Sequence, residues 1–209
     1  MKVVAFNGSP RSNSNTELAI KLVAAELNAH GIEVEIIQVG DKSIVGCKAC
    51  GACVRNRNER CITDDEVNGW IQKMKQADGI IFGAPIHYAE IGATMKAFLD
   101  RAFYVGANQG LFRHKVGAAI VAVRRAGGVP GFDQLNHYLQ YGEMFTPGSN
   151  YWNIIFGRAP GEASQDEEGI QTMRVLGRNM AYLLKLIENG KGKIEAPEPE
   201  KKILMNFIR

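Results

Sequence analysis

A run of small polar side chains near the amino terminus has the chemistry of a phosphate site. Residues 7–16 read N-G-S-P-R-S-N-S-N-T and lie between an apolar run at 3–6 and an amphipathic stretch that begins at 17. A helix that begins there leaves backbone N–H groups unpaired and carries a partial positive charge at its first turn. A phosphate satisfies both, and the Arg11 guanidinium adds a forked cationic donor. We expect the phosphate ligands to be Ser9, Arg11, Ser12, Asn13, Ser14, Asn15 and Thr16.

This loop matches neither of two common nucleotide motifs. It lacks the G-K-S/T of a Walker loop and the second and third glycines of the Rossmann fingerprint. One glycine among many hydroxyl groups suits a terminal monophosphate better than a buried pyrophosphate. The alternative interpretation is a strand joined to an ordinary helix that Ser14 or Asn13 caps, and it leaves Arg11 unexplained.

Four cysteines form the second chemical group. They are Cys47, Cys50, Cys53 and Cys61, with the spacing C-x2-C-x2-C-x7-C. The bacterial ferredoxin run shares the first two gaps but continues x3-C-P, whereas this chain has a gap of seven residues and Ile62 after the last cysteine. The block also carries Lys48, Arg55, Arg57 and Arg60. These cations would offset an anionic cluster, and they would equally lower thiol pKa values.

Two interpretations of the cysteines stay open: a [4Fe-4S] cluster on all four, or four free thiols. A structural zinc ion usually takes two separated C-x-x-C pairs, so it fits this spacing less well. Disulfides are disfavoured in a reducing cytoplasm, which is where we expect the chain, because its sequence enters a strand at once and shows no signal peptide.

Length and charge restrict the remaining classes. The chain has 209 residues and a formal charge of +3, which is too small to argue for nucleic acid, and it has no apolar run of about 20 residues that would span a membrane. We expect one domain over residues 1–190, with a cysteine-rich insertion at 40–63. A tail at 191–209 would pack on the domain or on a partner subunit, and its apolar end at 203–208 favours a homodimer or homotetramer.

Alternating apolar and amphipathic stretches must position these groups. Strands are predicted at 2–6, 33–39, 78–83, 115–123 and 151–156, the last with Tyr151 and Trp152 in its core; helices are predicted at 16–29, 66–76, 92–103, 132–142 and 166–188. This alternation predicts an α/β fold with a doubly wound, five-stranded parallel sheet and helices on both faces.

In such a sheet, ligands bind outside the carboxyl ends of the strands. With the strand order 2-1-3-4-5, the loops at 7–16, 84–88 and 124–128 lie at one edge. One ligand would then place a phosphate on the first loop and a planar head on the other two. FMN is a ligand of this kind, and flavodoxin-like sheets bind it at this position.

Three stretches resemble the NADPH-dependent FMN reductases of the flavodoxin-like superfamily: G-S-P-R-S-N-S-N-T, A-D-G-I-I-F-G-A-P-I-H-Y and M-K-A-F-L-D-R. The cysteine block resembles the iron–sulfur flavoprotein branch of that group, in which the last gap varies. The resemblance implies that the first loop holds the FMN phosphate and that the other two loops contact the isoalloxazine ring. The ring residues would be Pro85, Ile86, His87, Tyr88, Ala89, Arg124, Gly127 and Gly128.

The resemblance further implies hydride transfer from NAD(P)H to FMN, followed by delivery of electrons to a second acceptor. Because the flavin carries this chemistry, no side chain is assigned as a catalytic acid, base or nucleophile. Three function classes follow: an FMN-dependent NAD(P)H oxidoreductase with or without a [4Fe-4S] cluster, an electron-transfer carrier that does not oxidise NAD(P)H, and a cysteine redox sensor.

Overall fold

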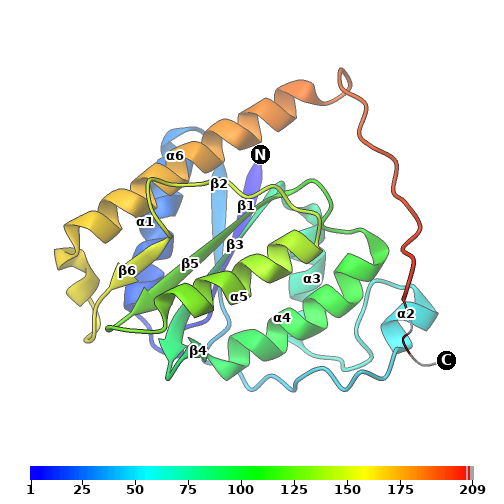
Figure 1. Cartoon of the computed structure of the whole chain (residues 1–209), viewed down its shortest axis with the longest axis horizontal. Coiled ribbons are helices and arrows are strands. Elements are labelled where there is room, and N and C mark those ends of the chain that lie inside the picture. The colour runs from blue at the N-terminus through cyan, green and yellow to red at the C-terminus, as the bar shows by residue number, and fades with distance from the viewer. Residues whose placement is uncertain (206, 208–209) are drawn as a thin grey trace.

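A parallel sheet forms the centre of the computed structural model, which describes residues 1–205 and 207 (Figure 1). Its strands lie in the order β2 (Glu33–Gln38), β1 (Lys2–Asn7), β3 (Gly79–His87), β5 (Val116–Val123) and β6 (Ile154–Phe156), all paired in parallel. A two-residue strand, β4 (Glu90–Ile91), adds to β3 in antiparallel register. The predicted fold class and the order 2-1-3-4-5 of the five long runs are confirmed.

Helices cover both faces of this sheet, and the alternation of side chains along β1 shows which helix lies on which face. Val3 and Ala5 pack with α1 (Asn15–Ala29) and α6 (Glu167–Gly190). Val4 and Phe6 pack with helices of the opposite layer. That layer consists of α3 (Glu66–Gln76), α4 (Ala93–Gly106) and α5 (Gly128–Tyr141).

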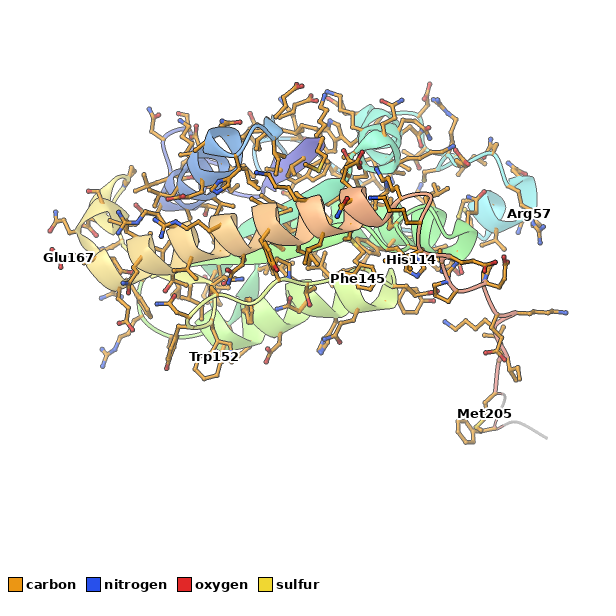
Figure 2. All side chains as sticks on the ribbon, turned by 90° about the horizontal axis from the view of Figure 1, so that it is seen from above. Arg57, His114, Phe145, Trp152, Glu167 and Met205 are labelled. Atoms are coloured by element: carbon orange, nitrogen blue, oxygen red, sulfur yellow. The ribbon has the colours of Figure 1, made fainter. Side chains whose placement is uncertain are left out.

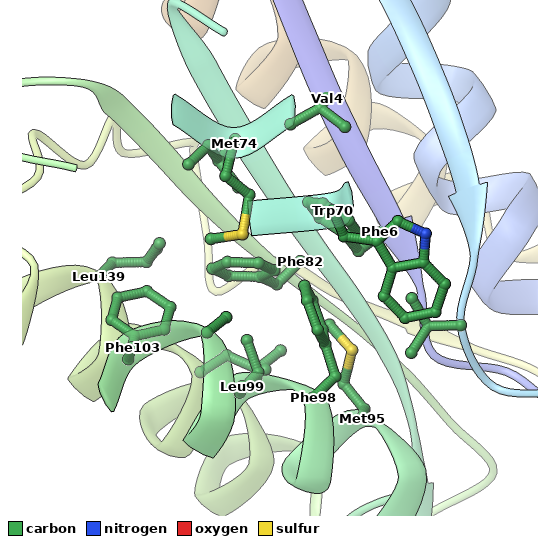
Figure 3. Close-up of a cluster of buried hydrophobic side chains, with 14 of the residues drawn as sticks. Val4, Phe6, Trp70, Met74, Phe82, Met95, Phe98, Leu99, Phe103 and Leu139 are labelled. Carbon is green, nitrogen blue, oxygen red and sulfur yellow. The ribbon is translucent and has the colours of Figure 1, made fainter. Parts of the chain in front are cut away.

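An aromatic cluster fixes α3 and α4 against the sheet (Figure 3). The rings of Phe6 and Phe98 lie 4.7 Å apart, and Trp70 meets Phe98 edge-on at 5.3 Å. Phe82 adds a second contact from β3 at 6.4 Å from Phe98. Aromatic side chains bury large apolar areas, so this cluster anchors α4 and the β3–β4 hairpin that leads into it.

Two predicted boundaries at the ligand-binding edge were wrong, and one short helix elsewhere was not predicted. β3 does not end at 83 but continues to His87, since it extends into a hairpin with β4. α5 begins at Gly128 instead of 132, because Gly127 takes the left-handed conformation with φ 87° and starts the helix early. A short helix, α2 (Ala52–Asn56), lies inside the cysteine block where none was predicted.

The last strand is also shorter than predicted, and its aromatic residues are not in the core. β6 begins at Ile154, and Tyr151 and Trp152 are 60% and 48% exposed. Figure 2 shows Trp152 at the surface. The two rings pack edge-on against one another, 4.5 Å apart, in the segment that approaches the strand.

The chain beyond α6 runs along the outside of the molecule toward α2 (Figure 1). Arg113 donates to the Pro197 carbonyl at 3.3 Å, and the Lys202 ammonium lies 3.0 Å from the Tyr141 hydroxyl. The predicted apolar end at 203–208 falls partly outside the described residues, and its described members, among them Met205, are exposed (Figure 2). In the described part of the chain, no helix has both the length and the apolar character that a membrane span needs.

Candidate functional site

A cavity of about 270 Å³ lies at the carboxyl edge of the sheet, and all three predicted loops contribute to it. A fourth segment, at 157–160 after β6, completes its wall. The lining residues are Ser9, Pro10, Arg11, Ser14, Asn15, Thr16, Pro85, Ile86, His87, Ala122, Arg124, Gly157, Arg158 and Pro160. The predicted convergence of the loops after β1, β3 and β5 is therefore observed.

The end of β1 holds the first loop in a fixed shape. The side chain of Asn7 is fully buried; its Oδ1 accepts from the Ser9 N–H at 3.1 Å and its Nδ2 donates to Gln38 at 2.7 Å. A β-carbon on Gly40 would stand 2.3 Å from the Gly8 carbonyl oxygen. The loop after β2 can therefore come this close to the first loop only because residue 40 is a glycine.

The amino terminus of α1 offers free donors to this cavity. Ser14 caps the helix by accepting the Glu17 N–H at 3.1 Å, as the alternative interpretation expected. Within residues 1–205 and 207, the backbone N–H groups of Asn15 and Thr16 have no protein acceptor. The cap and an anion site are compatible, because the cap uses the third N–H of the helix and leaves the first two open.

The charges at the cavity are all positive. Arg11, Arg124 and Arg158 line it, and none of its lining residues is acidic. In the described part of the chain, none of these three guanidinium groups forms an ion pair with a carboxylate. A cavity that combines free arginines with a helix amino terminus attracts an anion such as a phosphate.

The side chain of Asn15, a predicted phosphate ligand, has a structural role. The amide of Asn15 is 8% exposed; it donates to the Ala159 carbonyl at 2.9 Å and accepts from the Ala163 N–H at 3.2 Å. This pair of bonds fixes the segment that carries Arg158. Asn15 therefore lines the cavity while its side chain is used to place another residue.

The β3–β4 hairpin and the start of α5 form the opposite wall. Tyr88 lies at the hairpin turn with φ 60° and is fully exposed. A β-carbon on Gly127 would lie 3.0 Å from Ile86 and 3.3 Å from the Cα of Ala89, so the α5 start is pressed against the hairpin. Of the predicted site residues, those that do not line the cavity are Ser12, Asn13, Tyr88, Ala89, Gly127 and Gly128.

Sequence reasoning missed Ala122, Gly157, Arg158, Pro160 and Pro10 as lining residues. A signal for Arg158 was present, because it follows the last predicted strand and so belongs to the same edge as the other loops.

The four cysteines surround a second, smaller cavity near the carboxyl-terminal half of α4, against which α2 packs. No lining residue is shared with the first cavity. Figure 2 places Arg57, which directly follows α2, at the opposite end of the molecule from Glu167, which begins α6. Within the described residues, no three His, Cys, Asp or Glu side chains are grouped as ligands of a single metal ion.

The four cysteines differ in their exposure around this cavity. Cys47 and Cys50 are exposed. Cys53 is buried, with its sulfur 3.8 Å from the Tyr104 carbonyl, and burial raises the pKa of its thiol. Burial also raises the pKa of the Cys61 thiol, but the backbone of Thr63 and the nearby positive charge of Arg101 outweigh it, so that this pKa lies below its usual value.

Buried polar side chains hold the last cysteine in place. Asn68 is 2% exposed; its side chain accepts the Cys61 N–H at 2.7 Å and donates to the Cys61 carbonyl at 3.1 Å. Arg101 also lines the cavity, and its Nε is buried without an acceptor among the described residues. Four thiols around one cavity, next to an unpaired cationic donor, fit an anionic [4Fe-4S] cluster, in which each iron takes one thiolate.

Comparison with known proteins identifies the family of the chain. Residues 1–158 match the family model described as NADPH-dependent FMN reductase. An iron–sulfur flavoprotein of Methanocaldococcus jannaschii is 33% identical over 195 residues, which cover 90% of this chain and all of that protein. An iron–sulfur flavoprotein of Methanosarcina thermophila is 30% identical over 195 residues, covering 92% of this chain and all of the relative.

A solved structure with a low sequence identity supports the fold. RosB, with a bound 8-demethyl-8-formylriboflavin-5′-phosphate intermediate, superposes with a TM-score of 0.72 at 15% identity, covering 100% of this chain and 94% of that one.

Proposed function

The chain belongs to the NADPH-dependent FMN reductase family, and from this premise we propose that it is an FMN-dependent oxidoreductase that passes electrons from NAD(P)H to a second acceptor. The observation that carries the proposal is the cavity at the sheet edge. It combines a helix amino terminus, and three arginines that form no ion pair with the residues the structure describes, with an apolar hairpin wall. A ligand with one phosphate and one planar head fits this combination.

The first loop would bind the FMN phosphate. Its proposed ligands are Ser9, Arg11, Ser12, Asn13, Ser14, Asn15 and Thr16, and Arg158 is a further cation at the same cavity. The open N–H groups of Asn15 and Thr16 are the donors that the proposal requires. Charge-assisted bonds of this kind are about twice as strong as neutral ones, so the loop would supply much of the binding free energy.

The hairpin and the α5 start would hold the ring. Pro85 and Ile86 present an apolar surface, and His87 closes it. Tyr88, Ala89, Gly127 and Gly128 lie directly behind or beside this wall. Arg124 would place positive charge near the ring, where it favours added electrons. FMN held by these residues would supply the chemistry of hydride uptake from a nicotinamide and of electron delivery to the next acceptor.

We further propose that Cys47, Cys50, Cys53 and Cys61 hold a [4Fe-4S] cluster, whose chemistry is the transfer of single electrons. The support is the shared cavity, the nearby buried arginine, and the relatives' names as iron–sulfur flavoproteins. In this proposal Asn68 and α2 would fix the thiols, and Lys48, the basic residue of the block that lines the cavity, would offset part of the cluster's negative charge.

A second function class is a carrier that binds FMN and a cluster but does not oxidise NAD(P)H. Its support is the cavity lined by the four cysteines, which would hold a one-electron centre. A cysteine redox sensor is the third class, since two of the four thiols are exposed. We also propose a cytoplasmic location, where thiols stay reduced, and a homodimeric or homotetrameric assembly.

One anaerobic experiment separates the oxidoreductase from the carrier and also tests the cluster. The purified protein is assayed for FMN, iron and acid-labile sulfide, and the flavin absorbance is followed after addition of NADH or NADPH. Bleaching by either nucleotide supports the oxidoreductase. Bound flavin that neither nucleotide bleaches favours the carrier. Iron-free protein whose flavin is bleached contradicts the proposed cluster but not the oxidoreductase. Protein that binds no added FMN contradicts the proposal for the first cavity.

A further inference from the structure

The guanidinium of Arg101, on α4, donates hydrogen bonds to both ends of the cysteine block. The side chain is 1% exposed. Its Nη1 donates to the Asp65 carboxylate at 2.6 Å and to the Val45 carbonyl at 3.4 Å, and its Nη2 donates to Asp65 at 2.7 Å and to the Thr63 carbonyl at 3.0 Å. Val45 precedes the first cysteine and Thr63 follows the last one, so one buried cation ties the two ends of the block to α4.

Counting the donors of this guanidinium leaves one of them unexplained. Arginine has five N–H donors, and the four on Nη1 and Nη2 are used. The fifth, on Nε, is buried and has no acceptor within the part of the chain that the structure describes. A buried donor without a partner is costly. Arg101 lines the small cavity together with all four cysteines, where an anionic sulfur would be the missing acceptor.

We propose that Arg101 is a positioning residue of the cysteine site: it holds the loop closed and keeps its Nε–H for an anionic sulfur of the bound cluster. The inference rests on the proposed [4Fe-4S] site. Asp65 is the ion-pair partner of Arg101. Its carboxylate accepts two hydrogen bonds from the guanidinium, which fixes the guanidinium and partly neutralises its charge.

The two members of the pair have opposite effects on a cluster. A hydrogen bond to a cluster sulfur and a nearby positive charge both favour the reduced state. Removal of Arg101 therefore lowers the cluster's reduction potential. Removal of the Asp65 charge leaves the guanidinium without its counter-ion and raises the potential. A purely structural role predicts loss of cluster in both variants, without opposite shifts.

The test compares Arg101→Gln and Asp65→Asn with the full-length protein after anaerobic reconstitution with iron and sulfide. Asn at position 65 retains an oxygen that can accept the Val67 N–H and cap α3. Arg57→Gln is the matched control, since Arg57 is an exposed arginine of the same block that does not line the cavity. The readouts are iron and sulfide per chain, iron retained against a chelator, the cluster midpoint potential, and FMN per chain.

We expect Arg101→Gln to bind FMN normally, to lose iron to the chelator about 10–100-fold more readily, and to shift the midpoint potential to a more negative value. Asp65→Asn should shift it to a more positive value, and Arg57→Gln should match the unmodified protein. Unchanged iron retention and potential in the first two variants overturn the inference. If Arg101→Gln does not fold, the direction of the Asp65→Asn shift decides. If the unmodified protein binds FMN but no iron, both the proposed cluster and this inference are overturned. If it binds iron, and Arg101→Gln and Asp65→Asn have the same iron retention and potential as the unmodified protein, only this inference is overturned.

Discussion

The side-chain amide of Asn15 donates to the carbonyl of Ala159 at 2.9 Å, and this bond joins the first turn of α1 to a loop 144 residues further along the chain. The loop also carries Arg158, the cation of the cavity that sequence reasoning missed. A residue that the sequence presents as a ligand thus serves, in the folded protein, to position a second candidate ligand.

Replacing Asn15 with alanine should therefore weaken both the fold and FMN binding. The change removes two hydrogen bonds of a buried amide, and we expect the free energy of unfolding to fall by about 1–2 kcal/mol. Urea unfolding and FMN titration measure the two effects. Arg158→Ala is the companion variant: FMN affinity should fall while stability stays unchanged. Full FMN affinity in Asn15→Ala would refute the link between the amide and the loop.

Substitution of Gly40 tests whether the β2 loop shapes the phosphate site. A β-carbon there would stand 2.3 Å from the Gly8 carbonyl oxygen, which is backbone and cannot move aside cheaply. Gly40→Ala should lower the free energy of unfolding by about 1–3 kcal/mol and weaken FMN binding. Gly46→Ala is the control, since its β-carbon would meet nothing within 4 Å. Equal stability and affinity in the two variants would show that the close approach has no effect.

Two adjacent arginines allow a matched test of charge at the cavity. Arg124 lines it, whereas Arg125 does not, although both are exposed. Arg124→Ala should raise the FMN dissociation constant about 10-fold, as loss of a charge-assisted contact does. Arg125→Ala should leave it unchanged. Fluorescence titration of FMN at low and moderate salt gives both values, and similar losses in the two variants would point to general charge instead of a specific contact.

Tyr138 should make stability fall at alkaline pH. Burial and the hydrogen bond to Asp100 raise the pKa of its hydroxyl from an ordinary 10.0 to about 12, despite Lys96 nearby. Because the folded-state pKa is the higher one, the stabilising effect is complete below pH 10 and is lost as the pH rises toward 12. The free energy of unfolding, measured by urea at several pH values, should decline less steeply over this range in Tyr138→Phe. Parallel curves for the two proteins would contradict the assignment.

Removal of residues 195–209 tests the proposed assembly. Ile203, Leu204, Met205 and Phe207 are between 77% and 89% exposed, and such a group of apolar side chains favours contact with another subunit. We expect the full chain to scatter light as a dimer or tetramer and the shortened chain to form a smaller species. FMN content is the control for folding. A full-length monomer, or an unchanged mass after truncation, would count against a role of the tail in assembly.

The sequence by itself determined the layers and three of the four loops at the cavity, and the strand order was taken from the flavodoxin-like pattern that these layers indicated. Strands such as β5, in which every residue is buried, require apolar runs, and the helices require a one-sided apolar stripe; both periodicities can be read directly from the residues. The rule that loops after parallel strands meet at one edge then placed residues 7–16 next to 84–88 and 124–128.

Tertiary structure alone decided where individual side chains are used. Asn15 turns toward Ala159, Arg158 joins the cavity, and Trp152 stays outside the core, because each outcome depends on partners far away in the sequence. The cysteine block shows the same division. Its spacing indicated a common site, but only the fold brings Arg101 to it, since hydrogen bonds across 36 and 38 residues depend on how α4 packs and not on any local pattern.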